Sequence, residues 1–184
     1  MAVITVREAL KQAMREEMLR DERVFLLGED IAAYGGSFAV TKGLVEEFGE
    51  ERVRDTPISE GVIVGTAMGS AVGGQRPDAE IMTINFAILA MDQIINHAAK
   101  MHYMFGGQWT VPMVMRTAAG WGQLSATHSQ TLEVFFAHVP GLKVIFAGTP
   151  YDSKGLLKAA IRDADPVVFI EHTALYGVKG EVPD

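Results

Sequence analysis

The chain has 184 residues, no cysteine, and 16 basic against 23 acidic side chains, giving a formal net charge of −7. This length suits one domain with a sizeable core, and the lack of cysteine excludes disulfides and cysteine-based metal sites. No basic cluster points to nucleic acid, and no apolar run reaches the roughly 18–20 residues of a membrane span. With no secretory signal pattern either, we expect a cytoplasmic protein of bacterial type, or an organellar one if the source is eukaryotic.

Helical and strand patterns alternate along the chain. Thr5 and Glu8 form a capping-box pattern ahead of an amphipathic helix. Short apolar segments predict buried strands at residues 23–30, 78–84, 110–117, 142–148 and 166–172. Further helices are predicted at residues 41–49, 60–73, 86–104, 129–139 and 150–163.

This alternation predicts an α/β fold, a doubly wound and mostly parallel sheet with helices on both faces. Ligands of such folds bind at the carboxyl ends of the strands, which directs attention to the loops at 29–38, 56–60, 83–86 and 117–128. No phosphate-binding loop, nucleophile elbow or zinc-binding helix motif occurs. The sequence therefore argues against a self-contained hydrolase or metalloenzyme.

The predicted helix at residues 60–73 has glycine at every fourth position. Gly61, Gly65, Gly69 and Gly73 fall on one helical face. Each costs about 1 kcal/mol of helix propensity relative to alanine, so close packing should compensate. The packing partner is either an element of the same chain or another subunit, and the pattern leaves both open.

Glu60 begins this helix, with Ser59 as its expected N-cap. A carboxylate there could simply complement the helix dipole. Its neighbours Pro57, Ile58 and Val62 are apolar, however, and burial among them would favour a carboxyl group that keeps its proton. Such a group could share that proton with a ligand nitrogen.

Several long stretches resemble one enzyme family, and together they cover essentially the whole chain. They include "LLGEDIAAYGGSFAVTKGL", "RVRDTPISEGVIVGTAMG", "NFAILAMDQIINHAAKMHYMFGGQ", "ATHSQ" and "PYDSKGLLKAAIRDADPVVFIEH", in this order. They are similar to beta subunits of the thiamine-diphosphate-dependent 2-oxo acid dehydrogenases, and "YGGSFAVTKGL" is closest to the pyruvate enzymes. The resemblance implies a transketolase-like, pyrimidine-binding domain that takes part in oxidative decarboxylation of pyruvate with acyl transfer to lipoyl-lysine. A branched-chain 2-oxo acid or acetoin enzyme, or a catalytically silent assembly domain, remains an alternative.

The resemblance also implies roles for individual residues. Glu60 matches the family's catalytic glutamate, which hydrogen-bonds a ring nitrogen of the cofactor's aminopyrimidine. Phe86 matches the aromatic residue that packs on that ring, and Ile58 is expected to line the same pocket. Glu29 matches an acid near the pyrimidine. His128 matches an active-site histidine that acts on the substrate or on transfer to lipoyl-lysine.

The family shares its cofactor between two subunits. The alpha subunit holds the diphosphate and Mg²⁺ through a Gly-Asp-Gly motif, which this chain lacks. We therefore expect thiamine diphosphate to be shared with an alpha partner. A potassium-like ion is implied at the main-chain carbonyls of Met113, Ala160, Asp163 and Asp165.

Two further partners are implied. A second beta subunit is expected to pack on the glycine face of residues 60–73, and an acyltransferase core is expected to dock on the family's C-terminal domain. That domain is absent from this sequence. Residues 1–184 are thus interpreted as the pyrimidine-binding domain, ending in an interdomain linker near residues 176–184.

Overall fold

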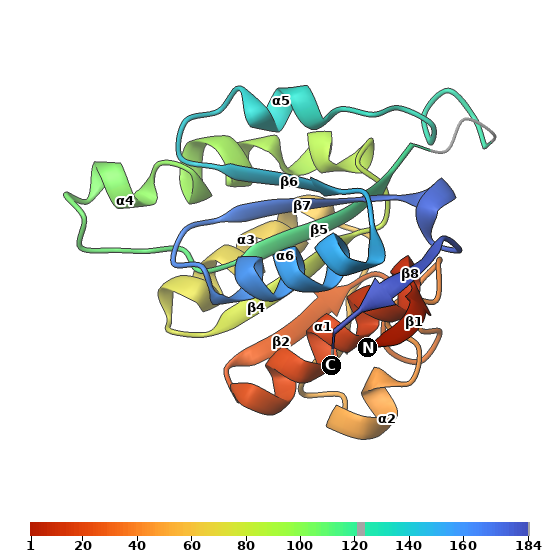
Figure 1. Ribbon diagram of the computed structural model, residues 1–184. Coiled ribbons are helices and arrows are strands. Elements are labelled where there is room, and N and C mark those ends of the chain that lie inside the picture. The colour runs from red at the N-terminus through yellow and green to blue at the C-terminus, as the bar shows by residue number, and fades with distance from the viewer. Residues whose placement is uncertain (121–123, 184) are drawn as a thin grey trace.

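The computed structural model describes residues 1–120 and 124–183, and its centre is a six-stranded sheet (Figure 1). The strand order is β3-β2-β4-β5-β7-β6, and every neighbouring pair is parallel. The strands are β2 (Val24–Gly28), β3 (Val53–Asp55), β4 (Arg76–Ile81), β5 (Val114–Ala119), β6 (Lys143–Ala147) and β7 (Val167–His172). β2 is buried throughout, as its continuous apolar run predicts for a strand covered on both faces.

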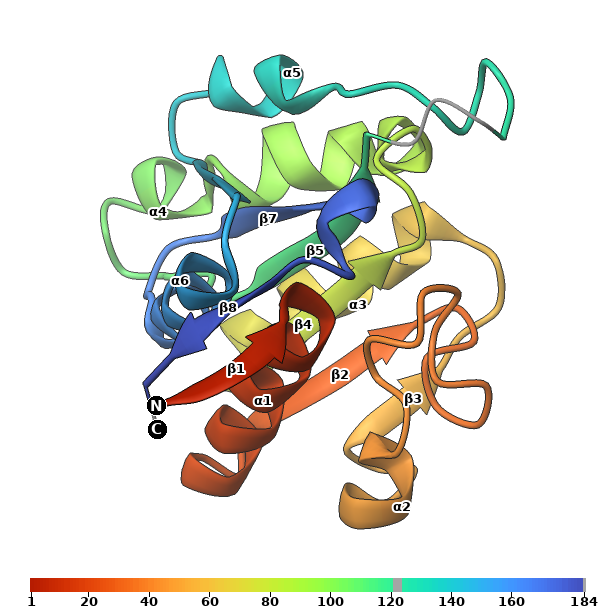
Figure 2. The ribbon, with the colours of Figure 1, turned by 45° about the vertical axis from the view of Figure 1, so that its right-hand side comes forward.

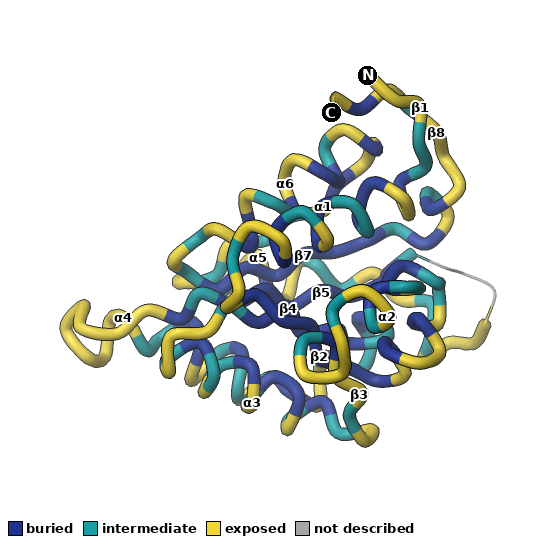
Figure 3. The backbone as a smooth tube through the Cα atoms, turned by 90° about the horizontal axis from the view of Figure 1, so that it is seen from below, coloured by how far each residue is buried: buried dark blue, intermediate teal, exposed yellow. Residues whose placement is uncertain are grey.

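Helices cover both faces of the sheet. α1 (Val6–Arg20) and α6 (Pro150–Arg162) pack on one face, and α3 (Glu60–Val72) lies on the other with residues 86–104 (Figure 3). The short helices α2 (Leu44–Phe48) and α5 (Glu133–Ala137) complete the fold. Each face has its own apolar cluster, which Leu10 and Leu26 represent on the first face and Ile63 and Leu27 on the second. The predicted doubly wound α/β fold is confirmed.

Side-chain caps fix where α1 and α6 begin. The Thr5 hydroxyl accepts a hydrogen bond from the Glu8 amide at 3.1 Å, and the Thr5 amide donates to the Glu8 carboxylate at 2.7 Å. This reciprocal pair is the predicted capping box. Thr149 caps α6 by accepting from the Asp152 amide at 3.1 Å, with Pro150 in the first helical position.

The prediction of one long helix over residues 86–104 is wrong. The segment divides into a 3₁₀ helix η1 (Phe86–Ala90), a π-helical stretch η2 (Asp92–Ala98) and the short α4 (Met101–Met104). In the π-helical stretch an amide bonds to the carbonyl five residues earlier, one residue further back than in an α-helix. The Ala99 amide, for example, donates to the Ile94 carbonyl at 3.0 Å. The buried residues Ala87, Ala90, Ile94 and Ala98 are three or four positions apart, as in an α-helix. Their spacing could therefore not reveal which carbonyl each amide would bond to.

A second, two-stranded sheet was not predicted. β1 (Ala2–Thr5) pairs antiparallel with β8 (Lys179–Val182), so the two ends of the described chain lie side by side (Figure 2). Residues 176–183 of the expected linker thus include β8, which follows the 3₁₀ turn η3 (Thr173–Leu175). Short strands that pair across the whole length of a chain leave no local signal. Within the described residues, no helix is long and apolar enough to cross a membrane.

Candidate active site

The strand connections change direction between the carboxyl ends of β2 and β4. The chain leaves β2 toward β3 on one side of the sheet and leaves β4 toward β5 on the other. Ligands of doubly wound sheets bind at this kind of switch point. Glu29 directly follows β2, Glu60 begins α3 after β3, and Phe86 begins η1 after β4. The sheet therefore brings three of the predicted site residues to one edge.

Glu60 is buried, with 5% of its surface exposed. Ser59 occupies the N-cap position but accepts no hydrogen bond through its side chain, so the predicted hydroxyl cap is absent. The Ser59 carbonyl instead accepts from the Ile63 amide at 2.9 Å as the first helical bond. Burial sets Glu60 apart from a solvated carboxylate that only complements the helix dipole.

Glu29 is a second buried carboxyl group, 6% exposed. Among the described residues, its Oε1 has no hydrogen-bond partner. Burial raises the pKa of Glu29, and the negative charges of Glu60, Asp30 and Glu80 raise it further. Glu29 therefore keeps a proton to higher pH than an ordinary glutamate, and it does so beside the predicted catalytic acid.

Phe86 and His128 meet across the same edge. Their rings are edge-to-face, with centroids 5.0 Å apart and planes at 84°. The Nδ1 atom of His128 lies 2.9 Å from the Ser125 hydroxyl and 3.1 Å from the Thr127 hydroxyl. Both contacts use Nδ1, which leaves Nε2 as the nitrogen that can meet a ligand.

Ile58 lies on the outside of this site. Its side chain is 81% exposed, and those of Val62 and Leu89 are 62% and 67% exposed. Leu89 is next to α3, because its carbonyl would lie 3.6 Å from a Cβ atom on Gly61. In this chain Ile58 therefore lines an open apolar surface beside Glu60 and does not line an enclosed pocket.

Three of the four carbonyls expected to bind a potassium-like ion already accept hydrogen bonds from the protein. Met113 accepts from the Val167 amide at 3.0 Å, Ala160 from the Asp163 amide at 3.2 Å, and Asp163 from Arg76 Nη1 at 2.9 Å. A cation would have to use their second lone pairs, next to the Arg76 guanidinium. In the described part of the chain, no cluster of His, Asp and Glu side chains is arranged to hold a metal ion.

A buried ionic cluster beside the site was missed by the sequence analysis. We define the Arg116 cluster as Arg116, Asp78, Glu80, Glu171 and Tyr176. Burial raises the pKa of Asp78 to about 6, against the opposing effect of Arg116. The sequence did contain a sign of this cluster, since three predicted apolar strands each carry charged residues. A charge buried in a strand needs a partner of opposite charge, so the acids and Arg116 could have been expected to meet.

Comparisons with known proteins agree with this fold. Residues 2–179 match the family described as transketolase, pyrimidine binding domain. A solved structure described as split gene transketolase, inactive beta4 tetramer, superposes with a TM-score of 0.74, covering 98% of this chain and 54% of that one. At 21% identity, that likeness supports the fold alone.

Sequence relatives are much closer. The chain is 53% identical to pyruvate dehydrogenase E1 component subunit beta of Rhizobium meliloti (strain 1021), over 100% of this chain and 40% of that protein. It is 51% identical to 2-oxoisovalerate dehydrogenase subunit beta of Bacillus subtilis (strain 168), over 100% of this chain and 57% of that protein. Identity to the chloroplastic pyruvate dehydrogenase E1 component subunit beta-2 of Arabidopsis thaliana is 48%, over 96% and 44%. The chain thus spans about half the length of the curated relatives it matches, and it belongs to the family of transketolase pyrimidine-binding domains.

Proposed function

We propose that this chain is the pyrimidine-binding part of a pyruvate dehydrogenase beta subunit, working in oxidative decarboxylation of pyruvate with acyl transfer to lipoyl-lysine. The observation that carries the proposal is the buried pair of acids at the switch point, Glu60 and the proton-retaining Glu29. Two of the three sequence relatives described above are pyruvate enzymes, including the one at 53% identity. The 2-oxoisovalerate relative keeps a branched-chain substrate as the second candidate.

The acids suit the aminopyrimidine of thiamine diphosphate. A carboxyl group held out of water can hydrogen-bond a ring nitrogen and hold the proton between acid and ring. Glu29 Oε1, which has no hydrogen-bond partner among the described residues, adds a second group that could hydrogen-bond the ring. Bound thiamine diphosphate would supply the electron sink for loss of carbon dioxide from a 2-oxo acid.

The remaining residues would orient and protect the ring. Phe86 offers an aromatic ring at the start of η1, and His128 lies perpendicular to it, with Nε2 left for the substrate or the lipoyl group. No Gly-Asp-Gly motif occurs in these 184 residues, so groups outside them would hold the diphosphate and its Mg²⁺. In this proposal the partner is an alpha subunit, and it covers the exposed Ile58, Val62 and Leu89 beside Glu60.

Two further assignments stay predictions. A second beta subunit would pack on the glycine face of α3, where a Cβ atom on Gly69 would meet nothing within 4 Å. A potassium-like ion would bind the carbonyls of Met113, Ala160, Asp163 and Asp165 through their second lone pairs, next to Arg76.

The test combines binding with activity. The chain is assembled with an alpha subunit of the same family, and release of carbon dioxide from pyruvate and from 2-oxoisovalerate is measured for the wild type, Glu60→Gln and Glu50→Gln. Glu50 is exposed and serves as the control. We expect a loss of at least about 100-fold for Glu60→Gln alone, the usual scale for removing an acid–base group. An unchanged rate would remove Glu60 from the mechanism.

Binding to the chain alone separates an enzyme part from a silent assembly domain. A 4-aminopyrimidine is titrated into the chain, and the ring signals of Phe86 are followed by NMR. Saturable shifts that Glu60→Gln weakens are expected. Their absence, together with intact self-association, would favour the assembly domain.

A further inference from the structure

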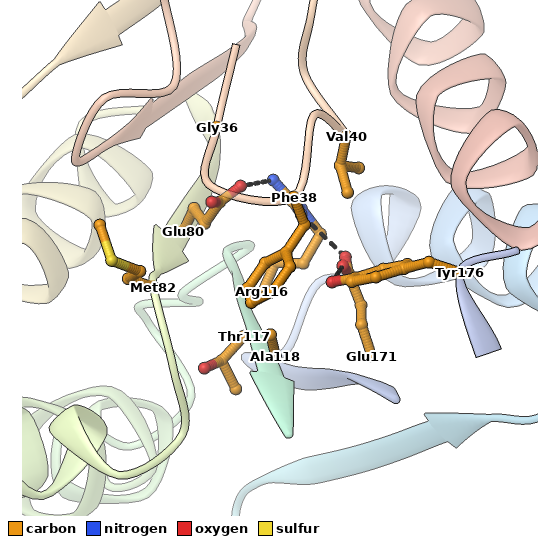
Figure 4. Close-up of a pocket in the computed structure, with 10 residues that line it drawn as sticks. All are labelled: Gly36, Phe38, Val40, Glu80, Met82, Arg116, Thr117, Ala118, Glu171 and Tyr176. Carbon is orange, nitrogen blue, oxygen red and sulfur yellow. Dashed lines mark hydrogen bonds and ion pairs between the residues drawn. The ribbon is translucent and has the colours of Figure 1, made fainter. Parts of the chain in front are cut away.

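Three carboxylates surround one guanidinium on the sheet face that α1 and α6 cover. Arg116 is 2% exposed. Its Nη1 binds Glu171 Oε1 at 2.8 Å, and its Nη2 binds Glu80 (Figure 4). Its Nε lies 3.4 Å from Asp78 Oδ1. The Tyr176 hydroxyl donates to the other oxygen of Glu171 at 2.5 Å. Each guanidinium nitrogen meets a different acid, so the cluster ties β4, β5 and β7 together. Lysine would keep the charge but has no planar fork to reach all three.

The cluster lies against the loop of residues 30–43, which we call the 30–43 loop. A Cβ atom on Gly36 would lie 3.7 Å from Glu80 Oε1, so Glu80 packs against the loop backbone. On the other side the Phe38 ring packs on Tyr176 with centroids 5.4 Å apart. Glu80 and Tyr176 therefore hold the loop from two sides, and Arg116 connects them through Glu171.

The loop backbone needs such support. Asp30 and Ala39 have φ of 54° and 57°, which is the left-handed region that non-glycine residues seldom adopt. Backbone in such regions persists where the surroundings impose it. Hydrogen bonds inside the loop join the Gly36 amide to Asp30 and the Ala39 amide to Gly36, at 2.8 and 2.9 Å.

The cluster leaves no room for a substrate. The cavity that it shares with Gly36, Phe38 and Val40 measures about 10 Å³, the space of a single water molecule. This cavity is too small for a substrate, so we look for the role of the cluster in how it positions the residues around it. Glu29, one of the two buried acids of the candidate site, directly precedes the 30–43 loop and is close enough to Glu80 for that charge to raise its pKa.

We propose that Arg116 is a positioning residue: through Glu80 and through Glu171 and Tyr176 it fixes the 30–43 loop, and the fixed loop holds Glu29 out of water beside Glu60. Charged groups that face Glu29 come from three elements: Asp30 in its own loop, Glu60 on α3 and Glu80 on β4. The part of the proposal that concerns catalysis rests on the function proposed above. The part that concerns the loop stands without it.

Hydrogen exchange tests the loop. Amide exchange in the full chain is measured for the wild type, Arg116→Lys and Tyr176→Phe. We expect the amides of Gly36 and Ala39 to exchange about tenfold faster in Arg116→Lys and a few-fold faster in Tyr176→Phe, because a lost hydrogen bond to a charged group has effects of that size. Amides of α3 should stay within about twofold of the wild type, since local opening does not spread to packed helices. The control is Arg54→Lys, an exposed arginine on β3 whose Nε donates to the Glu51 carbonyl at 2.8 Å.

A pH titration of Glu29, followed by its carboxyl NMR signal, tests the second step. Arg116→Lys keeps the charge, so the pKa of Glu29 should fall toward the ordinary value only if the loop loosens and admits water. A purely structural Arg116 would lower stability and leave that pKa where it is. If Arg116→Lys does not fold, Tyr176→Phe alone decides, because it removes only one hydroxyl group.

Unchanged exchange of the 30–43 loop in folded variants overturns the proposal, whatever the chain binds. Faster exchange and a shifted Glu29 in a chain that binds no aminopyrimidine would support the positioning role and refute the proposed function. The positioning role of Arg116 and the proposed binding of the aminopyrimidine can therefore be refuted independently.

Discussion

The rings of Phe86 and His128 lie nearly perpendicular to one another, at 84°, with their centroids 5.0 Å apart. This contact joins the loop that follows β4 to the loop that follows β5. Phe86→Leu removes the aromatic ring, so the signals of the carbon-bound ring protons of His128 should shift relative to those of the wild type. NMR of the imidazole signals measures this.

Phe146→Leu is the matched control for that experiment. Phe146 stacks on His172 with centroids 5.9 Å apart, so its loss should move the His172 signals and leave those of His128 in place. If Phe86→Leu also left the His128 signals in place, the contact between Phe86 and His128 would be absent in solution.

The pKa of Glu29 is expected to depend on the negative charge of Glu60. Burial is the first cause of the raised pKa of Glu29, and the charge of Glu60 is the second. Glu60→Gln removes that charge, so the pKa of Glu29 should fall, and its proton should be lost at lower pH than in the wild type. Carboxyl NMR across a pH series measures the shift. Glu50→Gln, at an exposed position, should leave Glu29 unchanged, and an equal shift in both variants would deny the pairing.

Local sequence rules predicted the parts of the fold that depend on local chemistry. The Thr5 and Glu8 box, the apolar strands and the stop of α2 at Gly49, with φ of 79°, follow from side chains and backbone freedom within a few residues. The third predicted strand begins later than expected, at Val114, because Pro112 has no amide to offer the sheet.

The rest depends on contacts between distant segments. Nothing near residues 2–5 announces that they pair with residues 179–182. The apolar neighbours of Glu60 left open whether it is buried or only complements the helix dipole, and its closeness to Glu29 follows from the strand order. Arg116 looked like an ordinary strand residue, because its three acids are separated from it in the chain and only the parallel register makes them neighbours.

Asp78 should make the chain less stable as pH rises. Its folded pKa of about 6 lies above the ordinary value of 3.8, so its stabilising contribution is complete below about pH 4 and is lost as pH rises through about 6. That loss is on the order of 3 kcal/mol. Asp78→Asn removes it, so the variant should gain on the wild type between pH 4.5 and 8 in urea unfolding, by about 1–3 kcal/mol.

Asp92→Asn is expected to show the opposite trend. The pKa of this exposed aspartate is lowered, first by the hydrogen bond from Asn96, so its contribution is present at neutral pH and is lost as pH falls. For Asp78→Asn, the contradicting result would be a difference in unfolding free energy from the wild type that stays the same at every pH. Asp78 would then keep one charge state, either charged or neutral, across the whole range.

The threonine caps should each contribute measurably to stability. Thr5→Ala and Thr149→Ala both remove a hydroxyl that accepts an amide hydrogen bond at 3.1 Å. The expected loss is about 1 kcal/mol each in urea unfolding. Ser59→Ala is the control at a cap whose side chain accepts no such bond, and about 0.5 kcal/mol or less is expected there. A larger loss at Ser59 would reveal a hydroxyl contact at the start of α3.

The glycine face of α3 divides into two parts. Cβ atoms on Gly61 and Gly65 would lie 3.6 Å from atoms of Leu89 and Gln93 in the same chain, whereas one on Gly69 would meet nothing within 4 Å. Gly73 is the C-cap and lies beyond the helix. The internal partner that the sequence left open therefore accounts for the first two glycines, and Gly69 alone remains to be explained by another subunit.

Gly69 and Gly155 form a matched pair that separates folding from assembly. Both are exposed helical glycines with open space around them, but Gly155 lies on α6, which covers the opposite face of the sheet. Replacement by alanine should raise the free energy of unfolding by about 0.5–1 kcal/mol at either position, because helix propensity improves. Replacement by leucine should weaken self-association in sedimentation only at position 69, since a larger side chain there would hold a second subunit away. If Gly155→Leu weakened association equally, or Gly69→Leu left it unchanged in a folded chain, glycine 69 would not lie in a subunit contact.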